Sequence, residues 1–407
     1  MPSPADFLKT LIPTATPLAR QKNNGHVHLP PNFSAFENVE QLIDMAKKEG
    51  IRALGVTNYY DFTVYGPFTE QARAAGIFPL FGLEIICLVD ELVKACVRIN
   101  DPGNPGKYYV CGKGITQFWD QTPRAKELYG AIRSADDKRM AEMSDKLSAV
   151  LTASGIPIKL TAQDVVARVV ARHGCPTETV TLQERHVAMV FQQAIFEAVP
   201  EVDRAAALEK TFGVASKNPA SATGVQNEIR SHLMKAGKPG FVAETFINFE
   251  TAYEVILELG GIPCYPTLAD GANPLCGYEE TPEHLVSELQ KRNIFMAEFI
   301  PLRNKPEVLT QYVTTLRAAG IPVCGGTEHN SLDLIPIEPF CIGGAPVPEA
   351  VQDIFWEGAC VVAAHQYLTA KGECGFVDKA GKPNSAYPDA EARIRAFAEL
   401  GARIMAA

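Results

Sequence analysis

Hydrophobic and polar positions near the start of the chain alternate between helical and strand periods. Residues 38–49 have the period of an amphipathic helix, with Val39, Leu42, Ile43 and Ala46 on one face. Residues 51–57 and 77–88 are short apolar runs typical of strands, and residues 66–75 repeat the helical period between them. Strands that alternate with helices at this spacing predict parallel βα units with both faces of the sheet covered.

The middle of the chain loses the strand pattern. Helical periods there cover residues 140–153, 161–172, 181–198, 202–212 and 225–236. The βα alternation returns after Phe246, with predicted strands at 261–265, 294–300 and 321–325 and predicted helices at 249–259, 282–291 and 305–319. Two further helices are expected at 348–370 and 390–406.

This order of elements predicts an α/β fold interrupted by one helical excursion. We expect residues 1–114 and 245–345 to form a discontinuous βα barrel, and residues 115–244 an all-helical insertion. Residues 346–407 are expected to supply C-terminal helices that pack on the barrel. About six or seven βα units suit a barrel better than an open sheet.

Composition narrows the function classes. The chain has 407 residues, 46% of them hydrophobic and 21% charged, which is ordinary for a soluble globular protein. No stretch approaches the roughly 18 apolar residues of a membrane-spanning helix. The formal net charge of −9 argues against binding of nucleic acid through an extended basic surface. We therefore expect a small-molecule substrate or ligand, with homo-oligomerisation left open.

The cysteines and the N-terminus indicate a cytoplasmic location. The chain has ten cysteines, and no two lie closer than nine positions, so it holds no C-x-x-C redox or zinc motif. The first residues lack the basic start and apolar core of a secretory signal. Buried, reduced thiols are the simplest interpretation.

Four groups of polar residues lie at or near predicted strand ends, where parallel α/β folds assemble their sites. His26 and His28 form an H-x-H pair whose imidazoles would share one face of a strand and could chelate one ion. Taken alone, such a pair is explained more often by chance and a structural histidine than by a metal. Glu84 is a carboxylate within an apolar strand, which is costly to bury unpaired and therefore favours a cation beside it.

The other two groups allow both a functional and a structural interpretation. Asn58, Tyr59 and Asp61 follow the strand 51–57 and could be an ordinary strand-to-loop turn. Thr327, Glu328 and His329 follow the strand 321–325 and could be a satisfied loop cap or the rim of a site.

Taken together, the order of these motifs resembles the polymerase and histidinol phosphatase (PHP) family of metal-dependent phosphoesterases. The resemblance covers residues 24–112 and 246–330. It implies a distorted (β/α)7, TIM-like barrel that holds up to three metal ions, commonly zinc or manganese, at the carboxyl ends of the strands.

The resemblance assigns metal ligands residue by residue. It implies that His26, His28, Glu84 and His329 are ligands, while Thr327 stands where the family has an aspartate. Tyrosine stands at three positions where the family has histidine: Tyr59, Tyr109 and Tyr265. Because a neutral phenol is a poor ligand, we expect one ion, zinc or manganese, rather than three.

Further residues complete the candidate site. Arg303 is expected to neutralise charge on a phosphate, and Glu328 or Asp61 to orient the attacking water. Candidate pocket residues besides the three tyrosines are Asn58, Asp270, Glu298 and Thr327.

Three functional hypotheses follow. The first is a metal-dependent phosphoesterase-like hydrolase acting on a small phosphorylated metabolite. The second, favoured by the three tyrosines, is a catalytically reduced barrel that binds a sugar, a sugar acid, a nucleotide or a protein partner without turnover. The third is metal-dependent hydrolysis of a non-phosphate bond such as C–N.

Overall fold

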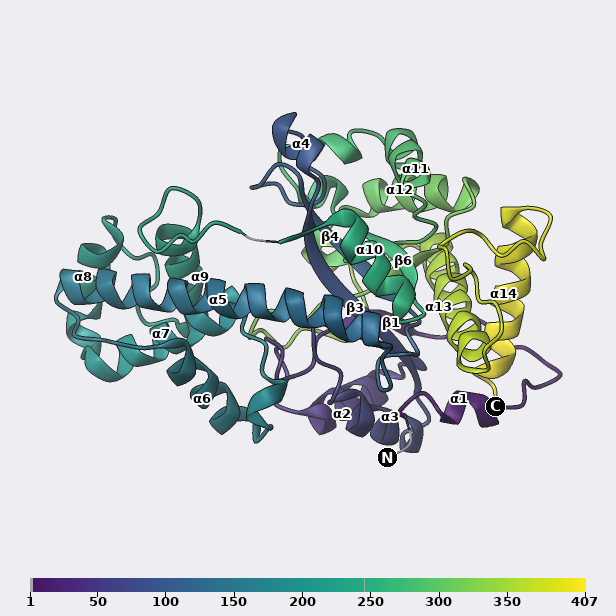
Figure 1. Ribbon diagram of the computed structural model, residues 1–407, viewed down its shortest axis with the longest axis horizontal. Helices are drawn as coiled ribbons and strands as arrows, with labels where there is room; N and C mark the ends of the chain where they lie inside the picture. The colour runs from purple at the N-terminus through teal and green to yellow at the C-terminus, as the bar shows by residue number, and fades with distance from the viewer. Residues whose placement is uncertain (1–2, 245) are drawn as a thin grey trace.

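The computed structural model describes residues 3–244 and 246–407 and contains a nearly closed, barrel-shaped sheet (Figure 1). The strand order around the sheet is β1-β2-β3-β4-β6-β7-β8, and the two-residue β5 pairs with β3 outside this path. The strands are β1 (Asn23–Val27), β2 (Ala53–Asn58), β3 (Phe78–Leu88), β4 (Lys107–Lys113), β5 (Ile247–Asn248), β6 (Ile262–Thr267), β7 (Ala297–Phe299) and β8 (Val323–Gly325).

One strand departs from the expected parallel arrangement. β1, β2 and β3 pair in parallel, as do β6, β7 and β8, but β4 runs antiparallel to both of its neighbours, β3 and β6. β3 reaches β4 through the short helix α4 (Asp90–Lys94) rather than through a long crossover. The connection, residues 89–106, does not cross the sheet but returns the chain beside β3, so the pair is antiparallel.

The barrel closes between the first strand and the last. Val27 forms a parallel bridge with Glu328, and the carbonyl oxygen of His26 accepts hydrogen bonds from the backbone nitrogens of Thr327 and Glu328 at 3.1 and 2.9 Å. Gly326 permits this approach, because a Cβ at that position would lie 2.5 Å from Cβ of His26. The closure brings the two ends of the sheet together at the histidine pair.

Helices cover the outside of the barrel. They begin and end where capping chemistry predicts: Asn38 caps α2 by accepting from the backbone nitrogen of Gln41 at 2.9 Å, and Gly50 ends it in the left-handed conformation. The helices of the barrel are α1 (Phe7–Thr10), α2 (Val39–Glu49), α3 (Tyr65–Ala74), α10 (Phe249–Glu258), α11 (Pro282–Lys291) and α12 (Pro306–Ala318).

The inserted segment is helical and extends to one side of the barrel (Figure 1). It contains α5 (Pro123–Ser154), α6 (Ala162–His173), α7 (Glu184–Ala198), α8 (Glu201–Phe212) and α9 (Ala222–Ile229), which continues as the π-helical η2 (Arg230–Met234). The insertion also contains one short 3-10 turn, η1 (Thr177–Thr179). Outside the insertion, 3-10 turns occur at η3 (Ala269–Gly271), η4 (Gly277–Glu279), η5 (Pro301–Arg303) and η6 (Ile342–Gly344).

The long helix α5 contributes to two hydrophobic cores. Its first part, including Leu128 and Ile132, packs into the core of the barrel, whereas its second part, including Met143 and Leu147, packs into a separate core of the insertion. We predicted only residues 140–153 of this helix. The division of the chain into domains stays a prediction, with α5 as the element that would join the two parts.

The last two helices pack on the barrel. α13 (Glu349–Ala370) lies so close to β8 that a Cβ at Gly358 would fall 2.2 Å from the carbonyl oxygen of Val323. α14 (Ala390–Ile404) lies against α13 at the edge of the molecule (Figure 1). Within the part of the chain that the structure describes, every helix is too short or too polar to cross a lipid bilayer.

Candidate metal centre

Three side chains direct their ligand atoms toward one another inside the barrel. Nε2 of His26 lies 3.3 Å from Nε2 of His28 and 3.5 Å from Oε2 of Glu84. Nε2 of His28 lies 3.4 Å from the same oxygen of Glu84. His26 belongs to β1, His28 follows that strand, and Glu84 is in the middle of β3. All three are buried, with exposed fractions of 1%, 1% and 5%.

The donor set fits one divalent cation. An ion held tetrahedrally about 2.0–2.1 Å from each ligand would space the ligands about 3.3–3.4 Å apart, close to the separations of this triad. Oε2 of Glu84 is buried and accepts no hydrogen bond from the described residues, which is unfavourable for a charged oxygen. A divalent cation held by His26, His28 and Glu84 would satisfy that oxygen.

A second carboxylate orients the first histidine. Oε1 of Glu298, in β7, lies 3.0 Å from Nδ1 of His26, on the side of the ring opposite the triad. The other oxygen of Glu298 lies 2.5 Å from the ammonium of Lys113, in β4, and both side chains are almost fully buried. Such a carboxylate fixes the ring orientation and tautomer of a metal-ligating histidine.

The charges of this buried group depend on one another. Burial alone lowers the pKa of His26, but the Glu298 carboxylate, aided by Glu84, outweighs it and raises the pKa to about 9. Burial also opposes ionisation of Glu298, yet Lys113 and His26 hold the pKa of Glu298 well below its usual value. Burial likewise opposes ionisation of Glu84, but His26 and His28 hold the pKa of Glu84 well below its usual value. In the metal-free protein, a proton on His26 therefore supplies positive charge that a cation would replace.

A second possible ligand group is already satisfied by the protein. Cys111, Glu298 and Nδ1 of His26 also lie close enough together to share an ion. Lys113 already neutralises Glu298, and burial raises the pKa of Cys111 well above its usual value, so the thiol is a poor ligand. The ammonium of Lys113 supplies the positive charge at this position.

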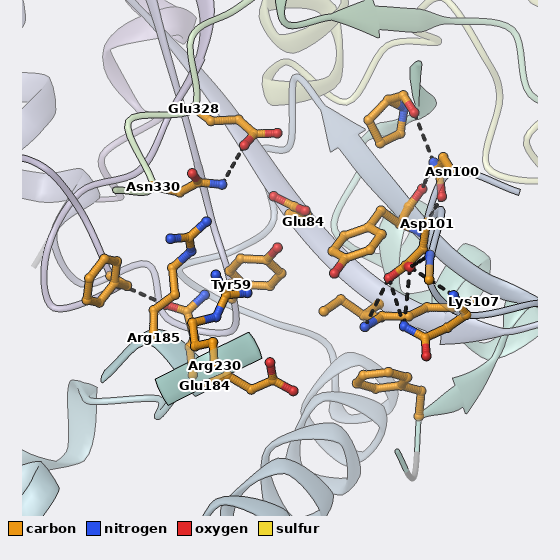
Figure 2. A pocket seen from close by; sticks show the side chains of 18 of the residues that line it. Tyr59, Glu84, Asn100, Asp101, Lys107, Glu184, Arg185, Arg230, Glu328 and Asn330 are labelled. Atoms are coloured by element: carbon orange, nitrogen blue, oxygen red, sulfur yellow. Dashed lines mark hydrogen bonds and ion pairs between the residues drawn. The ribbon is translucent and has the colours of Figure 1, made fainter. Parts of the chain in front are cut away.

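Glu84 of the triad lies in the wall of a cavity of about 670 Å³ between the barrel and the insertion (Figure 2). The barrel contributes Tyr59, Glu84, Tyr109, Glu298, Arg303 and Glu328 to its lining. The insertion contributes Asp136 and Arg139 from α5, Glu184 and Arg185 from α7, and Arg230 from η2. The volume is in the range of pockets that bind small metabolites.

The cavity rim carries an ionic cluster and two tyrosines. Glu328 pairs with Arg303 and accepts a hydrogen bond from the side chain of Asn330. The ring of Tyr59 stacks on His28, with centroids 5.4 Å apart and planes 6° from parallel. Burial and the nearby Glu84 raise the pKa of Tyr59 well above its usual value, and burial raises the pKa of Tyr109 to about 12. Both phenols are therefore neutral.

The structure does not bring His329 together with the triad. Its Nδ1 lies 2.7 Å from Oγ1 of Thr327, and its Nε2 lies 3.0 Å from the carbonyl oxygen of Ile335. The ring stacks on Phe36 instead. The backbone of Glu328 and His329 is left-handed, with φ of 60° and 53°, and this turn directs Glu328 to the cavity. Both ring nitrogens of His329 are thus engaged within the protein.

Four other candidate residues do not line the cavity, and their side chains are hydrogen-bonded elsewhere in the protein. The side chain of Asn58 makes two hydrogen bonds, each 2.9 Å, with the backbone of Leu29, just after the histidine pair. Asp61 accepts from the backbone nitrogen of Thr63, and Asp270 from the side chain of Asn304. The hydroxyl of Tyr265 lies 2.7 Å from the buried carboxylate of Glu279.

Sequence reasoning missed Lys113, Arg185, Arg230 and Asp136. Lys113 was hidden in the apolar pattern of a strand, where a buried ammonium, like the carboxylate of Glu84, requires a partner of opposite charge. Arg185, Arg230 and Asp136 lie in ordinary helical patterns. Nothing in a single sequence signals that these helices face the barrel.

Comparison with solved structures shows the fold. A "putative metal-dependent phosphoesterase" from Bifidobacterium adolescentis aligns over 82% of this chain and 95% of its own, with 16% sequence identity and a TM-score of 0.54. An amidohydrolase from Chromobacterium violaceum with bound sulfate and no metal aligns over 82% and 96%, with 17% identity and a TM-score of 0.50. No protein-family model and no curated protein matches the sequence. The chain thus shares its overall fold with these two proteins.

Proposed function

We propose that this protein is a metal-dependent hydrolase of the PHP type that cleaves a phosphate ester of a small metabolite. The observation that carries the proposal is the convergence of His26, His28 and Glu84 at 3.3–3.5 Å, with Glu298 behind His26. A buried group of two histidines and a carboxylate, with the carboxylate in the wall of a metabolite-sized cavity, is an arrangement that hydrolytic metal sites use.

Each residue around the cavity has a proposed part. His26, His28 and Glu84 hold the cation, and Glu298 keeps His26 in the tautomer that presents Nε2. A divalent cation bound at this position would supply Lewis acidity. Glu328 accepts a proton from the water that attacks phosphorus, and Arg303, which pairs with Glu328, stabilises negative charge on the phosphoryl group. The ester P–O bond breaks as the new P–O bond forms, and the departing alkoxide takes up the proton from Glu328 or from solvent water, so that the products are an alcohol and phosphate. Glu328 is preferred to Asp61 because only Glu328 lines the cavity.

A second candidate function is ligand binding without turnover. Tyr59 and Tyr109 line the cavity as neutral phenols and offer hydroxyl donors to a sugar or an anion. This function requires no ion at the triad. Hydrolysis of a C–N bond is distinguished from phosphoester hydrolysis by its product, which is an amine rather than phosphate, and from ligand binding by the release of any product.

The proposal is tested with protein loaded with zinc or manganese and a panel of phosphate monoesters and diesters. Phosphate release is expected from at least one substrate and is expected to be lost in His28→Ala. His284→Ala is the matched control, because His284 is exposed on α11, outside the cavity. The proposal would be contradicted if the metal-loaded protein released phosphate from no substrate of the panel, or if His28→Ala kept the activity.

A further inference from the structure

The basic side chains of the cavity divide into two kinds. Six of them line it, and four are matched by carboxylates of the described residues within ion-pair distance. These pairs are Lys107 with Asp101 and Glu244, Arg139 with Glu184 and Glu244, Lys235 with Glu184, and Arg303 with Glu328. The two that remain are Arg185 and Arg230.

Arg185 and Arg230 come from different helices of the insertion and meet at the cavity. Arg185 is in the first turn of α7, and Arg230 begins η2. Both line the large cavity and also a smaller recess beside it, so their side chains share one wall. Figure 2 shows both arginines on that wall, with Arg185 extending toward Asn330 and Glu328. Neither has a carboxylate of the described residues within 4 Å, and Nε of Arg230 is buried without an acceptor.

Two unpaired guanidinium groups in one wall are unfavourable without an anion. Burial, and then the positive charge of Arg230, lower the pKa of Arg185 to about 10. The largest compensating charge is that of Glu328, but Glu328 is already paired with Arg303. The amino-terminal end of α7 adds the positive end of a helix dipole beside Arg185. An oxyanion from outside the protein would satisfy these donors.

We propose that Arg185 and Arg230 form an anion subsite, through which the helical insertion binds a phosphate or carboxylate group of the substrate. The planar fork of arginine matches both oxyanions and binds them through paired hydrogen bonds. Tyr59 stacks on His28, and the cavity that Tyr59 lines is also lined by both arginines and by Glu84 of the triad. One ligand can therefore contact the arginine pair while its reacting group lies at the triad.

This inference deepens the proposed function and rests on it for the statement that the anionic ligand is a substrate. The subsite makes the insertion a specificity element: the substrate class is a small, anionic metabolite, and an uncharged ester of similar size would bind poorly. Binding of the anion itself requires neither metal nor turnover, so it can be measured separately.

The test is isothermal titration calorimetry on the full chain after chelator treatment, with inorganic phosphate in one arm and acetate in the other. At least one anion is expected to bind the wild type. The double variant Arg185→Gln with Arg230→Gln is expected to weaken that binding by about tenfold or more, because it removes charge-assisted hydrogen bonds. Arg172→Gln is the control, since Arg172 is exposed on α6 of the same insertion and outside the cavity. Thermal unfolding of all variants checks that they fold.

The outcomes decide between the subsite and the proposed function. Absence of binding of both anions to the wild type at about 50 mM, or a double variant that binds within about twofold of the wild type, would overturn the subsite. Anion binding that depends on the arginines in a protein that hydrolyses no ester would keep the subsite and overturn the hydrolase. Hydrolysis whose KM is unchanged in the double variant would keep the hydrolase and overturn the subsite.

Discussion

The carboxylate of Glu298 lies 3.0 Å from Nδ1 of His26, and this contact joins the seventh strand of the chain to the first. It leaves Nε2 of His26 free to face His28 and Glu84. The proposed metal centre depends on that arrangement, because a histidine turned by its carboxylate in this way is prepared to bind a cation.

Replacing the orienting carboxylate tests this role. Glu298→Gln is expected to lower the affinity for zinc or manganese by about 10–100-fold, since outer-shell partners of metal ligands have effects of this size. Competition with a chromophoric chelator measures it. Glu258→Gln, at a partly exposed carboxylate on α10 that accepts a hydrogen bond from Thr122, is the control. An unchanged metal affinity in Glu298→Gln would show that Glu298 serves packing alone.

Lys113 and Glu298 are expected to stabilise the fold as a unit. Lys113→Met leaves a buried carboxylate without its main partner, and we expect it to lower the free energy of unfolding by about 3–5 kcal/mol. The double variant Lys113→Met with Glu298→Gln is expected to lose much less than the sum of the single changes. Urea unfolding of all four proteins measures the coupling, and additive losses would contradict the pairing.

Tyr59 is the position where a further ligand is expected to fit. Its ring stacks on His28 beside the triad, and its phenol is neutral because burial raises its pKa. Tyr59→His would place an imidazole there, and slower loss of metal to a chelator is expected, with Tyr59→Phe as the control. Equal rates for the two variants would show that this side chain cannot reach the ion.

The stability of the protein is expected to depend on the ionisation of Asp136. Burial raises the pKa of Asp136 from 3.8 to about 7, so the folded state favours the neutral acid. Stability from this group is fully present below pH 3.8 and falls as pH rises toward about 7. Asp136→Asn is therefore expected to match the wild type near pH 4 and to exceed it by about 4 kcal/mol at pH 8, since each pKa unit corresponds to about 1.4 kcal/mol. Parallel stability curves for the two proteins would contradict this role of Asp136 in the cavity wall.

Most of the barrel and part of the site can be predicted from the sequence. The period of two along β1 placed His26 and His28 on one face, and the cost of burying Glu84 indicated a cation. Those two signals are local, so they can be read from one strand at a time. The antiparallel β4 and the first half of α5 were not predicted, because strand direction and the end of a helix depend on what they pack against.

The residues that sequence reasoning misplaced or missed depend on contacts across the fold. His329 follows an apolar strand as a ligand would, but two left-handed residues turn it toward Thr327 and Ile335. Arg185 and Arg230 belong to helices whose periods show only which face is buried. Their meeting at the cavity follows from how the insertion docks, which no local pattern encodes.

The metal content of the purified protein tests the proposed metal centre most directly. Inductively coupled plasma mass spectrometry would be applied to protein prepared without chelator or histidine tag, beside His26→Ala and the control His284→Ala. About one equivalent of zinc or manganese per chain is expected in the wild type and the control, and almost none in His26→Ala. A wild-type protein that stays metal-free after incubation with both ions, or a His26→Ala protein that keeps its metal, would contradict a cation site at His26, His28 and Glu84.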